Sequence, residues 1–80
     1  MEETKVYDSQ IFKEALIGSV FKEVASILSE RGYNPINQLV GYLMSGDPGY
    51  ISSYKDARKK ILSINRSDLL AFLINEYLNK

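Results

Sequence analysis

Apolar residues recur at helical spacing through most of the chain, beginning at residue 12. The first apolar stripe consists of Phe12, Leu16, Val20, Val24 and Leu28, widened by Ile17, Phe21 and Ile27. Charged residues lie between these positions, so the pattern predicts an amphipathic helix of about five or six turns. Asp8 or Ser9 can cap its start. Gly32 can end it, because glycine accepts the left-handed conformation that follows a helix end.

Two pairs of a capping residue and a proline follow. Asn34-Pro35 predicts the start of a second helix, because asparagine is a good N-cap and proline suits the first helical position. Its apolar face comprises Ile36, Leu39, Val40, Leu43 and Met44. Ser45-Gly46 ends this helix. Asp47-Pro48 repeats the start signal and predicts a short helical turn through Tyr50 and Ile51.

The last third of the chain contains two more start signals. Ser53 and Asp56 have the spacing of a capping box, with aspartate in place of the usual glutamate, and predict a third main helix. That helix carries Ala57, Ile61, Leu62 and Ile64. Asn65 and Asp68 repeat the same spacing before a final helix. Its apolar residues are Leu69, Leu70, Leu73, Ile74, Tyr77 and Leu78, with Phe72 beside them. This face is wider than one neighbouring helix covers, which indicates either a subunit interface or the most buried helix of the domain.

The whole pattern predicts an all-α fold, because no segment shows the alternation of a strand. We expect a compact bundle of about four helices joined by short proline-capped turns. Residues 1–8 are polar and charged and have no apolar period, so they read as a flexible N-terminal arm. The rest, residues 9–80, is predicted to form a single helical domain, since a chain of 80 residues makes one domain at most.

The chain contains neither cysteine nor histidine. Disulfides, the usual zinc ligands, a Ser-His-Asp triad and a Cys-His pair are therefore excluded. We expect no enzymatic activity, no metal and no cofactor. A domain this small usually needs stabilisation beyond its own core, and with no covalent or metal staple we expect a homodimer.

Charge and hydropathy narrow the class of partner. Ten basic residues balance ten acidic ones, whereas a nucleic-acid binder normally carries a basic excess. No apolar stretch approaches the roughly 18 residues of a membrane span. The opening Met1-Glu2-Glu3 does not resemble a signal peptide. These features favour a cytoplasmic protein that does not insert into a membrane.

A few polar groups remain as candidates for chemistry. The carboxylates Asp47, Asp56 and Asp68 stand where helix caps or turns are expected, which favours capping over catalysis or metal binding. Arg58, Lys59 and Lys60 form a basic run that is either a solvated helix face or a contact for phosphate or a partner. Because of this run, and of five tyrosines that can stack on bases or close a small core, a small helical nucleic-acid-binding domain remains the alternative function. These are Tyr33, Tyr42, Tyr50, Tyr54 and Tyr77.

Residues 32–51 closely resemble the signature of the IreB-type regulatory phosphoprotein family. Asp56-Ala57-Arg58, the leucine-rich final helix and the chain length are also similar to that family. We interpret the signature as mainly structural scaffold. Its residues are Gly32, Tyr33, Asn34, Pro35, Asn37, Gln38, Gly41, Tyr42, Ser45, Gly46, Asp47, Pro48 and Tyr50.

The resemblance implies a small cytoplasmic protein of Gram-positive bacteria. In this family a membrane-anchored Ser/Thr kinase with wall-sensing extracellular repeats, opposed by a cognate phosphatase, acts on the N-terminal arm. The family bears on cell-envelope stress and tolerance of cell-wall antibiotics through a downstream protein that the sequence does not name. Glu2, Thr4 and Tyr7 match the arm pattern, and Thr4, the single threonine, is the implied phosphoacceptor. Tyrosine replaces the commoner phenylalanine, there is no second threonine upstream, and residues 65–68 are less acidic than usual.

Overall fold

The computed structural model describes residues 9–80, which contain only helices and their connections. The helices are α1 (Ser9–Glu30), α2 (Pro35–Ser45), the 3₁₀ helices η1 (Pro48–Tyr50) and η2 (Tyr54–Asp56), α3 (Ala57–Leu62) and α4 (Arg66–Leu78). The prediction of an all-α bundle with four main helices is confirmed.

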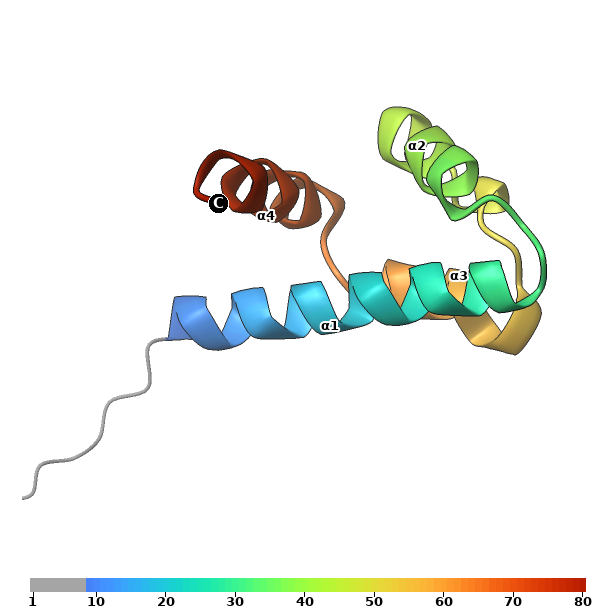
Figure 1. Cartoon of the computed structure of the whole chain (residues 1–80), viewed down its shortest axis with the longest axis horizontal. Coiled ribbons are helices and arrows are strands. Elements are labelled where there is room, and N and C mark those ends of the chain that lie inside the picture. The colour runs from blue at the N-terminus through green and yellow to red at the C-terminus, as the bar shows by residue number, and fades with distance from the viewer. Residues whose placement is uncertain (1–8) are drawn as a thin grey trace, which may run out of the picture.

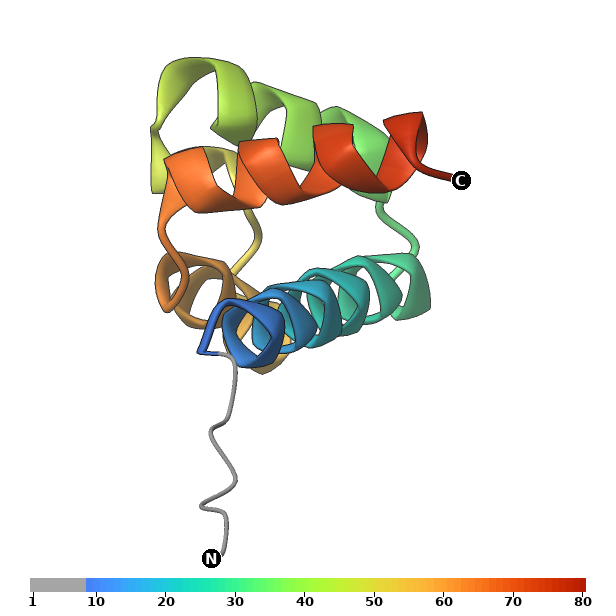
Figure 2. The same cartoon turned by 90° about the vertical axis from the view of Figure 1, so that its left-hand side faces the viewer.

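The long helix α1 is the centre of the fold. It contacts each of the other three α-helices (Figure 1). Viewed along α1, the molecule has two layers, with α2 and α4 in one and α1 and α3 in the other (Figure 2). The connections between the helices are short, and α2, η1 and α4 each start at a side-chain cap.

The predicted caps of α2 and α4 are confirmed. The Oδ1 atom of Asn34 accepts a hydrogen bond from the backbone N–H of Asn37 at 3.1 Å, and proline occupies the first turn of α2. Asn65 Oδ1 accepts from the N–H of Asp68 at 3.0 Å in the same way at α4. These bonds satisfy N–H groups that have no partner inside a helix.

Glycine ends two helices where the backbone enters the left-handed region. Gly46 has a φ of 78°, and its N–H donates to the carbonyl of Tyr42 at 2.7 Å to close α2. Gly32, with a φ of 92°, follows the end of α1. Asp47 then caps η1 by accepting from the N–H of Gly49 at 2.8 Å, so the predicted turn through Tyr50 is also confirmed.

The capping box predicted at Ser53 and Asp56 is wrong. The side chain of Ser53 makes no capping bond, and Ser52 Oγ instead accepts from the N–H of Tyr54 at 3.1 Å. Lys55 and Asp56 both have positive φ angles, 48° and 62°, which a capping box does not contain. Helix α3 therefore begins only at Ala57 and is six residues long.

The core lies where α1, α2, α3 and the η1–η2 segment meet, and Leu69 of α4 extends it. Its fully buried members include residues from α1, from the segment after η1, from α3 and from α4. They are Val24, Leu28, Ile51, Ala57, Ile61 and Leu69.

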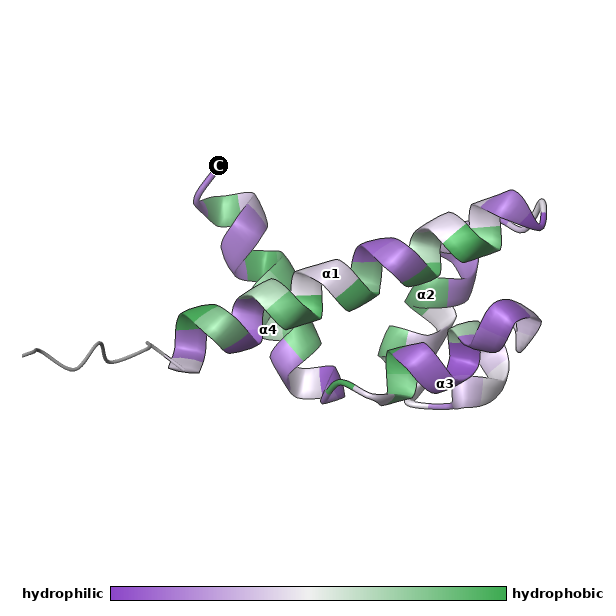
Figure 3. Cartoon of the chain, turned by 90° about the horizontal axis from the view of Figure 1, so that it is seen from below, coloured by the Kyte–Doolittle hydropathy of each residue, from purple (hydrophilic) through white to green (hydrophobic). Residues whose placement is uncertain are grey.

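Several residues of the predicted apolar faces are exposed instead of buried. Phe12 is 73% exposed and Leu16 54% exposed, because the short α3 lies alongside only the second half of α1 (Figures 1 and 3). On α2, Ile36 and Met44 are also exposed. In α4 only Leu69 is buried, so the interpretation of this helix as the most buried one is wrong.

Candidate functional site

The implied phosphoacceptor, Thr4, lies outside the residues that the structure describes. The same holds for Glu2 and Tyr7, which share its pattern. The described structure fixes one end of the segment that carries Thr4, because α1 begins at Ser9, five residues later.

The basic run on α3 does not form one open cluster. Arg58 is half-buried, and its Nε donates to the backbone carbonyl of Ile51 at 2.8 Å. Lys60 pairs with Glu23 of α1 at 3.3 Å. Lys59 is exposed between them. Two of the three cations therefore already contribute to the contacts that hold α3 in place.

The basic run on α3 also lies far from Ser9, the first residue of α1. Glu23, which pairs with Lys60, is fourteen residues after Ser9, or roughly 21 Å along a helix that rises about 1.5 Å per residue. The five residues from Thr4 to Ser9 span at most about 17 Å when fully extended. The backbone from Thr4 to Ser9 is therefore shorter than this distance even when fully extended, which disfavours contact between a phosphate on Thr4 and this run within one chain.

The family-signature residues make contacts within the fold. Gln38 Oε1 accepts from the N–H of Ser52 at 2.9 Å and fastens the segment after η1 to α2. The Tyr50 ring lies directly on Gly41, so closely that a Cβ atom at Gly41 would overlap it. Ser45 Oγ donates to the carbonyl of Gly41 at 2.7 Å. The first two contacts join α2 to η1 and to the segment after it, and the third lies within α2.

A polar and aromatic cluster lies at the C-terminal end of α1. Glu30 accepts hydrogen bonds from Lys55 Nζ at 2.6 Å and from the Tyr54 hydroxyl at 3.1 Å. The guanidinium of Arg31 lies over the rings of Tyr33 and Tyr54, at 5.9 and 5.5 Å from their centroids. The hydrogen bond from Lys55, followed by that from Tyr54, lowers the pKa of Glu30, and the bond to Glu30 raises the pKa of Lys55.

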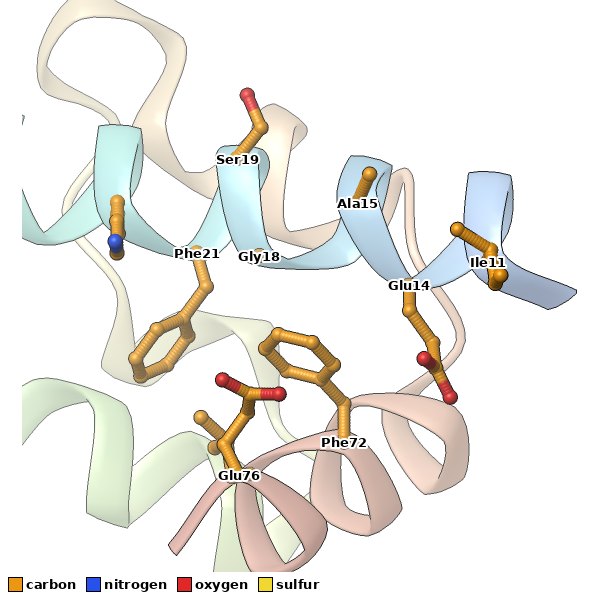
Figure 4. A pocket seen from close by; sticks show the side chains of 10 residues that line it. Ile11, Glu14, Ala15, Gly18, Ser19, Phe21, Phe72 and Glu76 are labelled. Atoms are coloured by element: carbon orange, nitrogen blue, oxygen red, sulfur yellow. The ribbon is translucent and has the colours of Figure 1, made fainter. Parts of the chain in front are cut away.

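A hollow of about 700 Å³ lies between α1 and α4. The rings of Phe21 and Phe72 point into it, and the carboxylates of Glu14 and Glu76 lie near the Phe72 ring (Figure 4). A Cβ atom at Gly18 would come within 2.9 Å of Phe72 Cζ, so this glycine lets α4 approach α1 closely. An open hollow lined mainly by apolar side chains is suited to binding another molecule rather than to catalysis.

Exposed apolar side chains occur on α2 and on α4. These two helices form the upper layer in Figure 2. On α2 the exposed side chains lie four residues apart, which places them along one side of the helix. They are Ile36, Val40 and Met44. On α4 they are Leu70, Ile74, Tyr77 and Leu78. We call these seven residues the α2–α4 apolar surface. Apolar patches of this kind on small proteins mark interaction sites.

The sequence did not indicate two features of this site. Glu30 and Lys55 are 25 residues apart, and no local pattern joins them. The left-handed pair at Lys55 and Asp56 occurs at residues that carry no glycine signal. Of the residues in this region, the sequence singled out only Tyr33 and Tyr54, as tyrosines that can stack on bases or close a small core.

Comparison with known families gives a match over nearly the whole chain. The model of the IreB regulatory phosphoprotein family matches residues 2–79. The match includes Thr4 and all of the helical signature. Within residues 9–80 no helix is both long and apolar enough to cross a membrane.

Proposed function

Because the chain belongs to the IreB regulatory phosphoprotein family, we propose that it is the substrate of a membrane-anchored Ser/Thr kinase and acts by protein contacts in cell-envelope stress signalling. It is a regulatory phosphoprotein and not an enzyme. The observation that carries the proposal is the family match over residues 2–79. We also propose that the protein is cytoplasmic and that a cognate phosphatase removes the phosphate. Its signalling affects tolerance of cell-wall antibiotics.

Thr4 is the proposed phosphoacceptor. It is the single threonine, and it lies in a polar segment, residues 1–8, that we propose to be a flexible arm before a helical domain of residues 9–80. A phosphate adds about −1.5 to −2 charges and three strong acceptor oxygens. Glu2, Glu3 and Asp8 already make this segment acidic. Phosphorylation therefore raises a local negative charge that a basic partner surface can read.

We propose two contact surfaces on the domain. The α2–α4 apolar surface is the proposed interface of a homodimer, because its side chains lack cover in the single chain and small domains gain stability from such burial. Arg58, Lys59 and Lys60 are the proposed polar contact with a downstream protein or with phosphate. The reach of the arm favours receipt of the phosphate by a second molecule over receipt by the same chain.

The experiment that tests this function is phosphate mapping by mass spectrometry after incubation with a kinase of the wall-sensing type. We expect one phosphate on Thr4 and no labelling of Thr4→Ala. The serines of the chain, among them Ser9, Ser52 and Ser53, serve as internal controls. Full labelling of Thr4→Ala, at these serines or elsewhere, would refute the assignment.

A further inference from the structure

The backbone is strained at one point, where η2 meets α3. Lys55 has φ and ψ angles of 48° and 37°, and Asp56 has 62° and 24°. Two consecutive non-glycine residues in the left-handed region are unusual, because the Cβ atom crowds the carbonyl oxygen in each of them. Such a conformation persists only where the surrounding structure holds it.

The contacts that hold this turn come from α1. The carboxylate of Glu30 accepts hydrogen bonds from Lys55 Nζ at 2.6 Å and from the Tyr54 hydroxyl at 3.1 Å. It therefore binds Lys55, the first residue with left-handed angles, and Tyr54, the residue before it. The guanidinium of Arg31 lies over the Tyr54 ring, 5.5 Å from its centroid. The side chain of Asp56 makes no capping bond at the start of α3 and does not hold the turn.

The turn positions the beginning of α3 and its basic residues. The N–H of Arg58 donates to the carbonyl of Ser52 at 3.1 Å, and that of Asp56 donates to the carbonyl of Ser53 at 3.0 Å. If the turn relaxed to ordinary backbone angles, both bonds would have to break. The Arg58 side chain would then leave the carbonyl of Ile51, and Lys59 would move with it.

We propose that Glu30 is a latch that keeps the strained Lys55–Asp56 turn closed and thereby holds Arg58 and Lys59 in position for contact with a partner. The latch is a two-state element, because the strain favours opening and the bonds to Glu30 favour closure. A partner that binds the ammonium group of Lys55 in place of Glu30 would open the turn. The partner-contact role of Arg58 and Lys59 rests on the proposed function, whereas the latch itself does not.

Backbone amide hydrogen exchange of the full chain tests the latch. In Glu30→Gln the exchange of the Asp56 and Arg58 amides should quicken about two- to fivefold, because weakening the half-exposed bonds to Glu30 increases local opening. The Leu69 amide, which donates to the carbonyl of Asn65 at the start of α4, should keep its rate. Glu23→Gln is the matched control, since it removes an exposed carboxylate of α1 that pairs with Lys60 near the other end of α3.

A second substitution separates strain from simple loss of a contact. Asp56→Gly removes the crowding at a left-handed position without touching Glu30. Added to Glu30→Gln, it should return the Arg58 amide to about its original rate. Unchanged exchange in Glu30→Gln, equal quickening in Glu23→Gln, or quickening that includes Leu69 would each overturn the latch. None of these readouts involves Thr4 or a partner, so a failed latch leaves the proposed function standing.

Discussion

At the scale of single residues, the Gly41–Tyr50 contact shows how the family signature holds the fold. An alanine in a helix is ordinarily more stable than glycine by roughly 0.5–1 kcal/mol. At Gly41 the added methyl group would overlap the Tyr50 ring, and overpacking costs about 1–3 kcal/mol. The clash is therefore the larger effect.

We predict that Gly41→Ala lowers the free energy of unfolding, measured by urea denaturation, by about 1–2 kcal/mol. In a Tyr50→Ala background the same change should be neutral or stabilising, because the clash is gone and helix propensity remains. An equal loss in both backgrounds would show that Tyr50 is not the cause. It would also indicate that Gly41 serves a contact outside the fold.

Glu30 makes the free energy of unfolding depend on pH in the acid range. Its pKa is lowered in the folded state by the hydrogen bonds from Lys55 and Tyr54. A lowered pKa means that the carboxylate stabilises the fold above its unfolded value, near 4.5, and that this contribution disappears as the pH falls through the folded value. We predict that wild-type protein loses more stability than Glu30→Gln as the pH falls below 4.5. Parallel urea-denaturation curves for the two proteins across that range would contradict this.

At the scale of elements, the predicted helix starts were right wherever the signal was local. Asn34, Asp47 and Asn65 each cap within three residues of themselves, so spacing alone was sufficient. The predicted start of α3 was wrong because Lys55 and Asp56 take left-handed angles, and the side chain that bonds to Lys55 is Glu30, far away in the sequence. A local capping pattern cannot predict a hydrogen bond to a residue on another helix.

Hydrophobic periodicity also did not determine how much of each apolar face is buried. The apolar stripe of α1 continues to Phe12, but α3 ends after six residues and leaves Phe12 and Leu16 exposed. A hydrophobic period shows which side of a helix is apolar and not how much of it another helix covers. The candidate site was harder still, because Arg58 and Lys60 looked free in the sequence and both make contacts within the fold.

At the scale of the whole molecule, the α2–α4 apolar surface predicts association. We expect sedimentation velocity to show a homodimer at tens of micromolar, roughly the range in which a modest apolar interface is populated. Ile74→Asp should give a folded monomer, because Ile74 is 59% exposed in the single chain and its replacement disturbs no core contact.

Asn75→Asp is the matched control for this change. It adds the same charge to the next residue of α4 and keeps an oxygen to accept the bond from Asn79. It should remain dimeric. A monomeric wild-type protein, or dissociation by both substitutions, would contradict the proposed interface.

The central claim is that phosphorylation of Thr4 changes what this protein contacts. The most direct measurement compares the proteins captured from a Gram-positive cytosolic extract by the unphosphorylated and the Thr4-phosphorylated chain, identified by quantitative mass spectrometry. The account predicts at least one protein whose capture changes with the phosphate, and the same protein should respond to charge reversal at Lys59. Identical captured sets for the two forms would contradict the claim.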